Sequence, residues 1–208
     1  MAFRIRPATV KDADFIIGAF DSVIPVLIEA GNAGQWGTEL FSDKDGFPDS
    51  TRDDLAQSEH FRTTGQGERM RTFVAEAHGS RARVAFITIR EGHFSQHISS
   101  LGALKASVDE AESLPGGFSY IDVLIADQRV PQDQRRGAGA ALIEHVKQHT
   151  REIGARDVYV DCWSGGDGKL VQYYHNVGFK SIASLEFKKK DGSIWAGILM
   201  RMQLDGEQ

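Results

Sequence analysis

The sequence predicts a single α/β (α+β) domain over residues 1–208, in which strands and helices alternate. Residues 118–126 are rich in β-branched and aromatic side chains, which is typical of a strand. After a short loop, residues 138–153 carry apolar side chains at three- and four-residue spacing, which is typical of an amphipathic helix. A chain of 208 residues is long enough for one domain with a full hydrophobic core.

The chain begins with a predicted strand and a predicted helix. Residues 3–6 favour a short strand, and Thr9 with Asp12 has the pattern of a capping box for the helix that follows. Pro25 lies inside this helical pattern. Because proline cannot donate a backbone hydrogen bond, we expect Pro25 to kink or divide the helix.

A loop, a second helix and a hairpin are predicted next. Residues 30–50 are rich in Gly, Asp and Ser, which indicates a loop with aromatic anchors such as Trp36. Residues 51–61 favour a second helix. Residues 71–77 and 82–90 alternate around a His-Gly-Ser turn, which predicts an antiparallel hairpin.

A long connection, residues 91–117, interrupts the series of strands. Its core, residues 101–114, has helical periodicity and an acidic face made of Asp109, Glu110 and Glu112. One interpretation is a substrate-side lid or an oligomer contact. The other is a solvated surface insertion, which is the more common explanation for such a charge cluster.

The C-terminal third is predicted to be mostly strands. Gly154 ends the preceding helix, and residues 157–162 favour a strand. Another strand starts at Phe179. A turn at residues 190–192 then leads to a final strand at residues 195–202.

The loop at residues 134–140, Gln-Arg-Arg-Gly-Ala-Gly-Ala, has the composition of an anion cradle. Glycines at a strand-to-helix junction let backbone N–H groups turn toward a ligand, and the helix N-terminus adds partial positive charge. Glycines at such a corner are also common where only a turn is needed. The loop lacks the P-loop pattern and the third glycine of a dinucleotide loop, so a nucleoside triphosphate or NAD is not expected.

Two motifs resemble those of the GNAT N-acetyltransferase superfamily. Gln134, Gly137 and Gly139 match the acyl-CoA pyrophosphate motif Q/R-x-x-G-x-G/A. Downstream, Tyr174 and Gly178 match the family pattern F/Y-Y-x-x-x-G-F. The start of the chain is similar to the opening I-R-x-A-x-x-x-D of many members. The order and separation of the motifs are those of the family.

The resemblance implies a mixed, twisted sheet of about six to seven strands, flanked by helices and splayed at the central strands to admit pantetheine. Relative to this plan, residues 91–117 are an insertion. The implied activity is direct transfer of an acetyl group from acetyl-CoA to an amine.

The resemblance also implies the residues that bind acetyl-CoA. By position, those along the pantetheine arm are Arg129, Val130 and Pro131. A backbone N–H near Arg129 or Val130 would polarise the thioester carbonyl. Those implied at the pyrophosphate are Gln134, Arg135, Arg136, Gly137, Ala138, Gly139 and Ala140.

Tyr174 is the implied general acid, which protonates the departing CoA sulfur. A phenol is protonated at neutral pH because its reference pKa is about 10. Without the motif, paired aromatics on a helix would be read as packing residues. For the general base, Asp122 and Asp127 are the available acids, with Asp122 preferred by its position. Ordered water is a further alternative.

Five other positions carry weaker hypotheses. Trp36 is expected on the acceptor side, with core packing as its competing explanation. Asp167 stands where many members have Asn, and it can cap a helix but cannot donate from its side chain. Cys162 is expected to be buried and inert rather than a nucleophile. His93 and His97 have the spacing of a metal pair but no third ligand, so no metal is expected.

Composition limits the partners and the setting. A formal net charge of −5 argues against a nucleic-acid surface, and no apolar run is long enough to cross a membrane. A single cysteine and no secretory segment suggest the cytoplasm. The preferred acceptor is a small-molecule amine. A protein Lys or N-terminus, a non-catalytic acyl-CoA-binding domain and a homodimer are left open.

Overall fold

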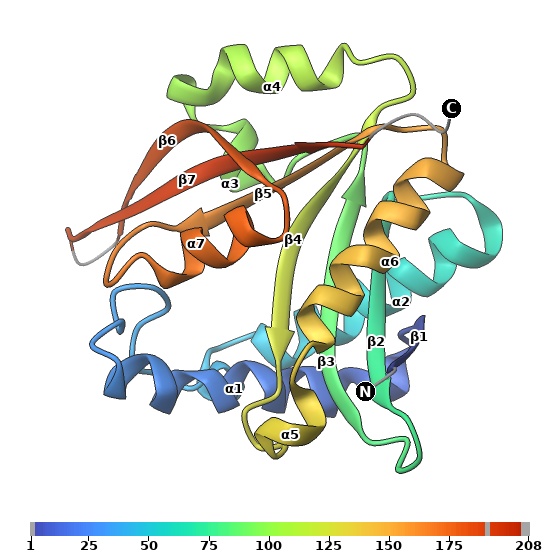
Figure 1. The fold of residues 1–208 in the computed structure, drawn as a ribbon, viewed down its shortest axis with the longest axis vertical. Coiled ribbons are helices and arrows are strands. Elements are labelled where there is room, and N and C mark those ends of the chain that lie inside the picture. Colours follow the sequence, from blue (N-terminus) through green and yellow to red (C-terminus); the bar gives the residue numbers. More distant parts are fainter. Residues whose placement is uncertain (1–2, 190–191, 205–208) are drawn as a thin grey trace. The chain divides into compact units, whose positions relative to one another are not determined.

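The computed structural model describes residues 3–189 and 192–204 (Figure 1). Its strands are β1 Phe3–Pro7, β2 Met70–Ala77, β3 Arg83–Glu91, β4 Phe118–Ala126, β5 Asp157–Trp163, β6 Lys180–Lys188 and β7 Ile194–Gln203. They form a seven-stranded sheet in the order β1-β2-β3-β4-β5-β7-β6. β1 is antiparallel to β2 and β4 is parallel to β5, so the predicted mixed sheet is confirmed.

The α-helices are α1 Ala13–Glu29, α2 Phe47–Thr64, α3 Gln96–Ser99, α4 Lys105–Glu112, α5 Gln132–Arg135, α6 Ala138–Glu152 and α7 Lys169–Asn176. Short 3-10 turns are η1 Val10–Asp12, η2 Phe41–Asp43 and η3 Gly102–Leu104. The chain divides into two compact units. The first runs up to Ile89 and includes Val123–His145, and the second comprises Arg90–Asp122 and the chain from Val146 onward.

In the first unit, α1 and α2 pack against the sheet (Figure 1). Their shared core contains Phe15, Ile16, Ala19, Leu55, Val74, Phe86 and Ile125. Phe73 is next to Val74 in β2, so its side chain lies on the opposite face of the sheet. The ring of Phe73 lies 4.5 Å from that of His145 in α6. The two faces of this part of the sheet are therefore covered by different helices.

Most predicted elements of the first unit are confirmed, with two corrections. The Thr9 amide donates to Asp12 Oδ2 at 2.9 Å, as expected for a capping box. α1 continues through Pro25 to Glu29, so the proline does not divide this helix, and the alternative of a kink stays a prediction. The missing N–H costs one bond, but the amides after Pro25 still find acceptors within the helix.

The second helix starts earlier than predicted. α2 begins at Phe47, where Pro48 occupies the first turn and Gly46 precedes it in a left-handed conformation with φ 74°. Proline is well tolerated at the first helical position because its missing N–H has no acceptor there. The prediction missed this start because it treated the proline as part of the preceding loop.

In the second unit, residues 91–117 are part of the core. Their buried side chains are Phe94, Ile98, Leu104, Val108 and Ala111, which pack against Phe118, Tyr120, Tyr159, Leu185 and Leu199 of the sheet. Burial of each large apolar side chain contributes about 1.5–3 kcal/mol. The interpretation as a solvated insertion was therefore wrong, although the predicted acidic face of α4 is indeed exposed.

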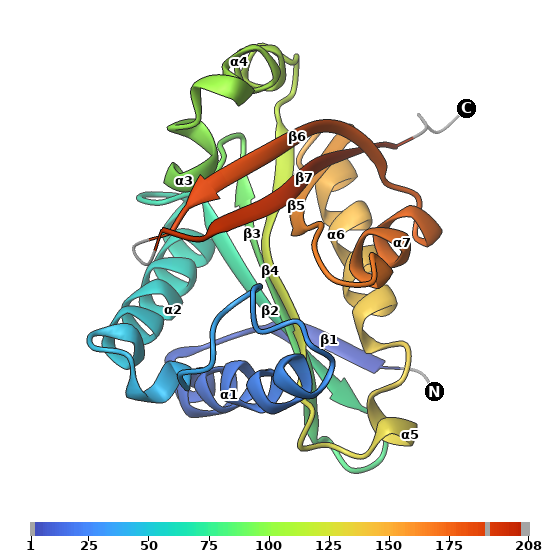
Figure 2. The same ribbon diagram turned by 90° about the vertical axis from the view of Figure 1, so that its left-hand side faces the viewer.

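The two faces of the second unit carry different elements (Figure 2). α3 and α4 cover the face with Tyr120, whereas the C-terminal turns of α6 reach the other face, where Thr150 Oγ1 donates to Ser119 Oγ at 2.7 Å. The predicted final hairpin is present as β6 and β7. Lys190 and Asp191, which belong to the predicted turn, lie outside the described residues.

Candidate active site

The parallel strands β4 and β5 carry the same Tyr-x-Asp pattern where their pairing ends. Their register runs from Phe118↔Asp157 to Ile121↔Val160, and both strands continue beyond it. Tyr120 on β4 lies opposite Tyr159 on β5 in this register. Two residues further along, each strand carries an aspartate, which is Asp122 on β4 and Asp161 on β5. We call this place the fork. Two carboxylates stand at the fork, on neighbouring strands.

At the fork, Asp122 is held in an ion pair. Arg90 Nε donates to Asp122 Oδ2 at 2.9 Å, and both side chains are 20% exposed. The carboxylate is thus largely neutralised by a guanidinium. Asp122 as a general base stays a prediction.

Asp161 has different partners. The hydroxyl of the fully buried Tyr120 donates to Asp161 Oδ1, and His97 Nε2 lies 3.6 Å from the same oxygen. Burial, followed by the charges of Asp161 and Asp122, raises the pKa of Tyr120 well above its usual range. Tyr120 therefore acts as a hydrogen-bond donor to the carboxylate.

Ser95 and His97 of the insertion complete this group. Ser95 Oγ donates to Tyr120 Oη at 3.2 Å and lies 2.8 Å from His97 Nδ1. Burial alone lowers the pKa of His97, but its interactions with Asp161 outweigh burial and raise the pKa above 6.5. We call Ser95, His97, Tyr120 and Asp161 the fork cluster.

Tyr174 lies on α7, where Gly168 precedes the helix in a left-handed conformation with φ 70°. Its side chain is 5% exposed and its ring packs 5.6 Å from that of Phe179. Burial, followed by the nearby Cys162, raises the pKa of the phenol far above its usual value. Within residues 3–189 and 192–204, its hydroxyl makes no hydrogen bond, and its oxygen is not among the polar atoms that are sealed from solvent.

Cys162 is buried on β5, and its Sγ lies 3.7 Å from Met200 Sδ. Burial, followed by the charge of Asp161, raises its pKa to about 12. A thiol in this state is a poor nucleophile at neutral pH, because the thiolate is the reactive form. This agrees with the expectation that Cys162 is inert.

The first unit contains the predicted pyrophosphate loop. α5 ends at Arg135, Gly137 has φ 88°, and α6 begins at Ala138. The first backbone bond of α6 runs from the amide of Ala141 to Gly137 O at 3.0 Å. The amides of Ala138, Gly139 and Ala140 come before it and point out of the helix end, as in a helix-terminal anion site.

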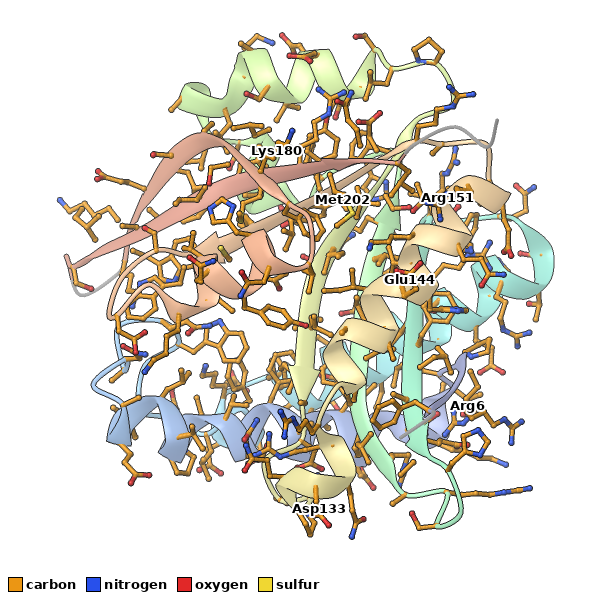
Figure 3. The ribbon with its side chains drawn as sticks, viewed as in Figure 1. Arg6, Asp133, Glu144, Arg151, Lys180 and Met202 are labelled. Carbon is orange, nitrogen blue, oxygen red and sulfur yellow. The ribbon has the colours of Figure 1, made fainter. Side chains whose placement is uncertain are left out.

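The long side chains of this loop differ in exposure. Gln134 and Arg135 are half-buried and Arg136 is exposed. Arg135 Nε donates to Val130 O at 3.0 Å, which fixes the loop against the preceding segment. Figure 3 marks the neighbouring helices by Asp133 on α5 and Glu144 on α6, both exposed.

The segment before the loop is tied down by Asp127. Its carboxylate accepts hydrogen bonds from the Arg129 amide at 2.9 Å and from Arg129 Nη2 at 2.7 Å. The Val130 amide donates to Asp127 O at 3.2 Å. The amides of Arg129 and Val130 are therefore already bonded, which counts against them as donors to a thioester carbonyl. Asp127 is equally occupied and is a weak candidate for a base.

Comparison with solved structures identifies the fold. The chain aligns over its full length with yncA of Salmonella typhimurium, solved with its cofactor acetyl-CoA, at 17% identity, 96% coverage of that chain and a TM-score of 0.60. A GNAT-family acetyltransferase from Listeria monocytogenes aligns with 97% of this chain and 95% of its own, at 17% identity and a TM-score of 0.61. The chain has the GNAT acetyltransferase fold.

A ribosomal-protein-alanine N-acetyltransferase from Brucella melitensis shares this GNAT fold. It aligns with 97% of this chain and 99% of its own, at 16% identity and a TM-score of 0.61. No family model and no curated protein matches the sequence. The predicted GNAT-type sheet is thus confirmed by structural likeness.

Two further predicted positions of the GNAT-like site have local structural roles. Trp36 packs in an aromatic cluster, with its ring 5.8 Å from that of Phe20 and 5.6 Å from that of Phe41. Core packing accounts for much of its environment, and its role at the acceptor stays a prediction. Asp167 Oδ1 accepts a hydrogen bond from the Lys169 amide at 3.1 Å, as expected of a residue at a helix start.

In the part of the chain that the structure describes, no three His, Cys, Asp or Glu side chains converge as a metal site would require. No described helix has the length and apolar character needed to span a membrane.

Sequence reasoning missed the fork cluster. The signal was present as two Tyr-x-Asp triplets, Tyr120–Asp122 and Tyr159–Asp161, on successive predicted strands. Pairing these strands in parallel would have placed Asp161 beside Asp122. The approach of Ser95 and His97 had no comparable signal, because it depends on how the insertion packs.

Proposed function

We propose that this chain is an acetyl-CoA-dependent N-acetyltransferase that transfers the acetyl group directly to an amine of a small molecule. The observation that carries the proposal is Tyr174. It matches the family's general acid, its burial keeps the phenol protonated, and its hydroxyl has no partner in the described residues. A phenol that makes no hydrogen bond to these residues is available to donate to a bound ligand.

The start of α6 supports the donor half of the proposal. Acetyl-CoA is the co-substrate, and its pyrophosphate would be held by the amides of Ala138, Gly139 and Ala140 with the side chains of Gln134, Arg135 and Arg136. The fit rests on the left-handed Gly137 and on amides that precede the first bond of the helix. Arg129 and Pro131 would lie along the pantetheine arm.

The chemistry requires a proton acceptor, donors for the oxyanion and a proton for the leaving sulfur. The neutral amine attacks the thioester carbonyl carbon, and the tetrahedral intermediate collapses with cleavage of the C–S bond. Tyr174 donates its proton to the sulfur, so that neutral CoA leaves. Because the phenol is a weak acid, it can hold this proton until the sulfur acquires charge.

We include residues 91–117 in a single acetyltransferase domain covering residues 1–208. The buried face of residues 91–117 belongs to the core of the second unit, and this segment contributes Ser95 and His97 to the fork cluster. A cytoplasmic setting and a homodimer stay predictions.

A protein amine is the second candidate acceptor. The ribosomal-protein-alanine N-acetyltransferase from Brucella melitensis shares the fold, and this favours an N-terminal amine over other protein acceptors. A non-catalytic acyl-CoA-binding domain would have no need of an unpartnered phenol at the acid position.

The test combines acetyl-CoA binding with release of free CoA in a panel of small amines and peptide N-termini. We expect acetyl-CoA to bind and at least one small amine to be acetylated. Acetylation of peptides alone would replace the small-molecule acceptor by a protein. Binding without acetylation of any amine would indicate the non-catalytic alternative.

Tyr174→Phe tests the acid. We expect turnover to fall by about 10²-fold, the usual contribution of a general acid, with acetyl-CoA affinity unchanged. Tyr173→Phe is the matched control, because the neighbouring phenol packs 5.4 Å from that of Tyr174 but lies outside the motif position. Equal losses in both variants would remove Tyr174 from the mechanism.

A further inference from the structure

We propose that His97 Nε2 takes the proton from the acceptor's ammonium group, with Ser95, Tyr120 and Asp161 fixing its orientation. This inference rests on the proposed function and adds a catalytic residue from the insertion. It also specifies the acceptor as an amine that arrives in its protonated form.

A chain of hydrogen bonds fixes the tautomer of His97. Tyr120 has one hydroxyl proton, and Tyr120 donates it to Asp161 Oδ1. Ser95 Oγ, 3.2 Å away, therefore donates its own proton to Tyr120 Oη. Ser95 Oγ is 2.8 Å from His97 Nδ1, and with its proton already used it must accept from Nδ1–H. This leaves Nε2 as the basic nitrogen.

The surroundings of Nε2 suit a proton acceptor. Asp161 Oδ1 lies 3.6 Å away, beyond hydrogen-bond range but close enough to stabilise the imidazolium that forms. The His97 side chain is 46% exposed, whereas that of Asp161 is 10% exposed. The histidine is thus the accessible end of a buried chain, an arrangement that resembles the Ser-His-Asp logic of oriented bases.

Each charged or titratable group facing His97 can be assigned. Asp161 on β5 and Asp122 on β4 favour the imidazolium, and Arg90 on β3 opposes it. Tyr120 stays neutral, and the ring of Phe187 on β6 packs 5.5 Å from the imidazole. The balance raises the pKa of His97 above its usual value of 6.5.

Asp122 is less suited to the same role. Its carboxylate is already occupied by an ion pair, because Arg90 Nε lies 2.9 Å from Asp122 Oδ2. His97 has no such permanent cation on its basic nitrogen.

The proton transfer balances. The ammonium R–NH3⁺ gives one proton to neutral His97, which becomes an imidazolium, and the resulting R–NH2 attacks the thioester carbonyl. The second amine proton leaves after the C–N bond forms. Tyr174 supplies the proton of the CoA thiol, and the phenolate and the imidazolium return to their resting forms by exchange with water. The net products are the amide, CoA and one proton.

His97→Gln tests the proposal with the full-length chain. Near neutral pH we expect kcat/KM for the amine to fall about 10²-fold, with acetyl-CoA affinity unchanged. The wild-type acid limb, which bends at the pKa of His97, should be replaced by a rate that climbs steadily with pH. His97→Ala should regain part of its activity on addition of imidazole. A purely structural role would change neither the shape of the profile nor the response to imidazole.

His93→Gln is the matched control, because His93 belongs to the same segment and contacts Glu91 O at 3.2 Å. It should keep the wild-type profile. An unchanged profile in His97→Gln would overturn the proposal.

A measurement without turnover separates this proposal from the proposed function. Nitrogen-15 NMR of the free protein should show His97 protonated at Nδ1, and its pKa should fall in Asp161→Asn. The opposite tautomer, or an unchanged pKa, would overturn the base assignment even if amines are acetylated. If wild type binds acetyl-CoA but acetylates nothing, the proposed function fails first, and the base role of His97 fails with it.

Discussion

Two strand segments of this protein have nearly the same sequence but different environments. Tyr120-Ile-Asp122 on β4 and Tyr159-Val-Asp161 on β5 run parallel, with Tyr120 opposite Tyr159. Asp122 is neutralised by Arg90 at 2.9 Å. Asp161 instead accepts from Tyr120 and faces His97. One carboxylate has a permanent counter-charge, and the other has a counter-charge that depends on pH.

The difference arises from which segment packs over each strand. The insertion brings Ser95 to Tyr120 on β4 and His97 to Asp161 on β5, and β3 brings Arg90 to Asp122. Nearly identical triplets therefore acquire different partners, because the groups around a carboxylate depend on tertiary packing more than on its neighbours in sequence. Substitutions at matched positions can test this contrast.

The largest effect is expected from Asp161→Asn. The asparagine can still accept from Tyr120, but it cannot stabilise the imidazolium of His97. We expect kcat/KM for the amine to fall about 10²-fold near neutral pH. Asp157→Asn is the control, because Asp157 lies on the same strand with the same 10% side-chain exposure but pairs with Arg201. A similar rate loss in both variants would mean a general electrostatic effect.

The hydroxyl groups of Tyr120 and Tyr159 should differ in their contribution to the free energy of unfolding. Tyr120→Phe removes the donor to Asp161 and the acceptor for Ser95, so we expect the free energy of unfolding to fall by about 1–3 kcal/mol. Tyr159→Phe should cost less than about 1 kcal/mol, because its hydroxyl has no hydrogen bond within the described chain. Denaturant titration measures both. Equal losses of unfolding free energy in the two variants would show that the hydrogen bonds of Tyr120 in the fork cluster add nothing to stability.

Asp122→Asn should have a small effect on rate. Arg90 loses one partly exposed ion pair, worth about 0.5–1 kcal/mol of unfolding free energy, and kcat/KM should stay within about threefold of wild type. Steady-state kinetics decides between the two carboxylates. A loss of about 10²-fold here, with Asp161→Asn near wild type, would restore Asp122 as the base.

The smallest effect is a pH dependence of stability. Because the pKa of His97 is raised on folding, its stabilising contribution is complete below the unfolded value of 6.5 and is lost as the pH rises through the folded pKa. The difference in unfolding free energy between wild type and His97→Gln should therefore shrink as the pH rises above 6.5. Since the side chain is half-exposed, we expect less than about 1 kcal/mol. A difference that grows with pH would contradict the raised pKa.

The sequence predicted most elements because their signals are local. Strand and helix periodicity located β4 and α6, and the motif spacing located Tyr174 on a helix. The failures came from tertiary context. Pro25 is tolerated inside α1, and residues 91–117 bury Phe94, Leu104 and other apolar side chains in a core that their charged face concealed.

The sequence by itself determined the alternation of strands and helices, the glycine-rich start of α6 and the position of Tyr174, since each depends on residues a few positions apart. The tertiary structure decided which carboxylate is paired with Arg90 and which with His97. It also decided that the amides of Arg129 and Val130 are occupied by Asp127. The physical reason is that protonation and hydrogen bonding depend on atoms within about 4–6 Å, whatever their separation along the chain.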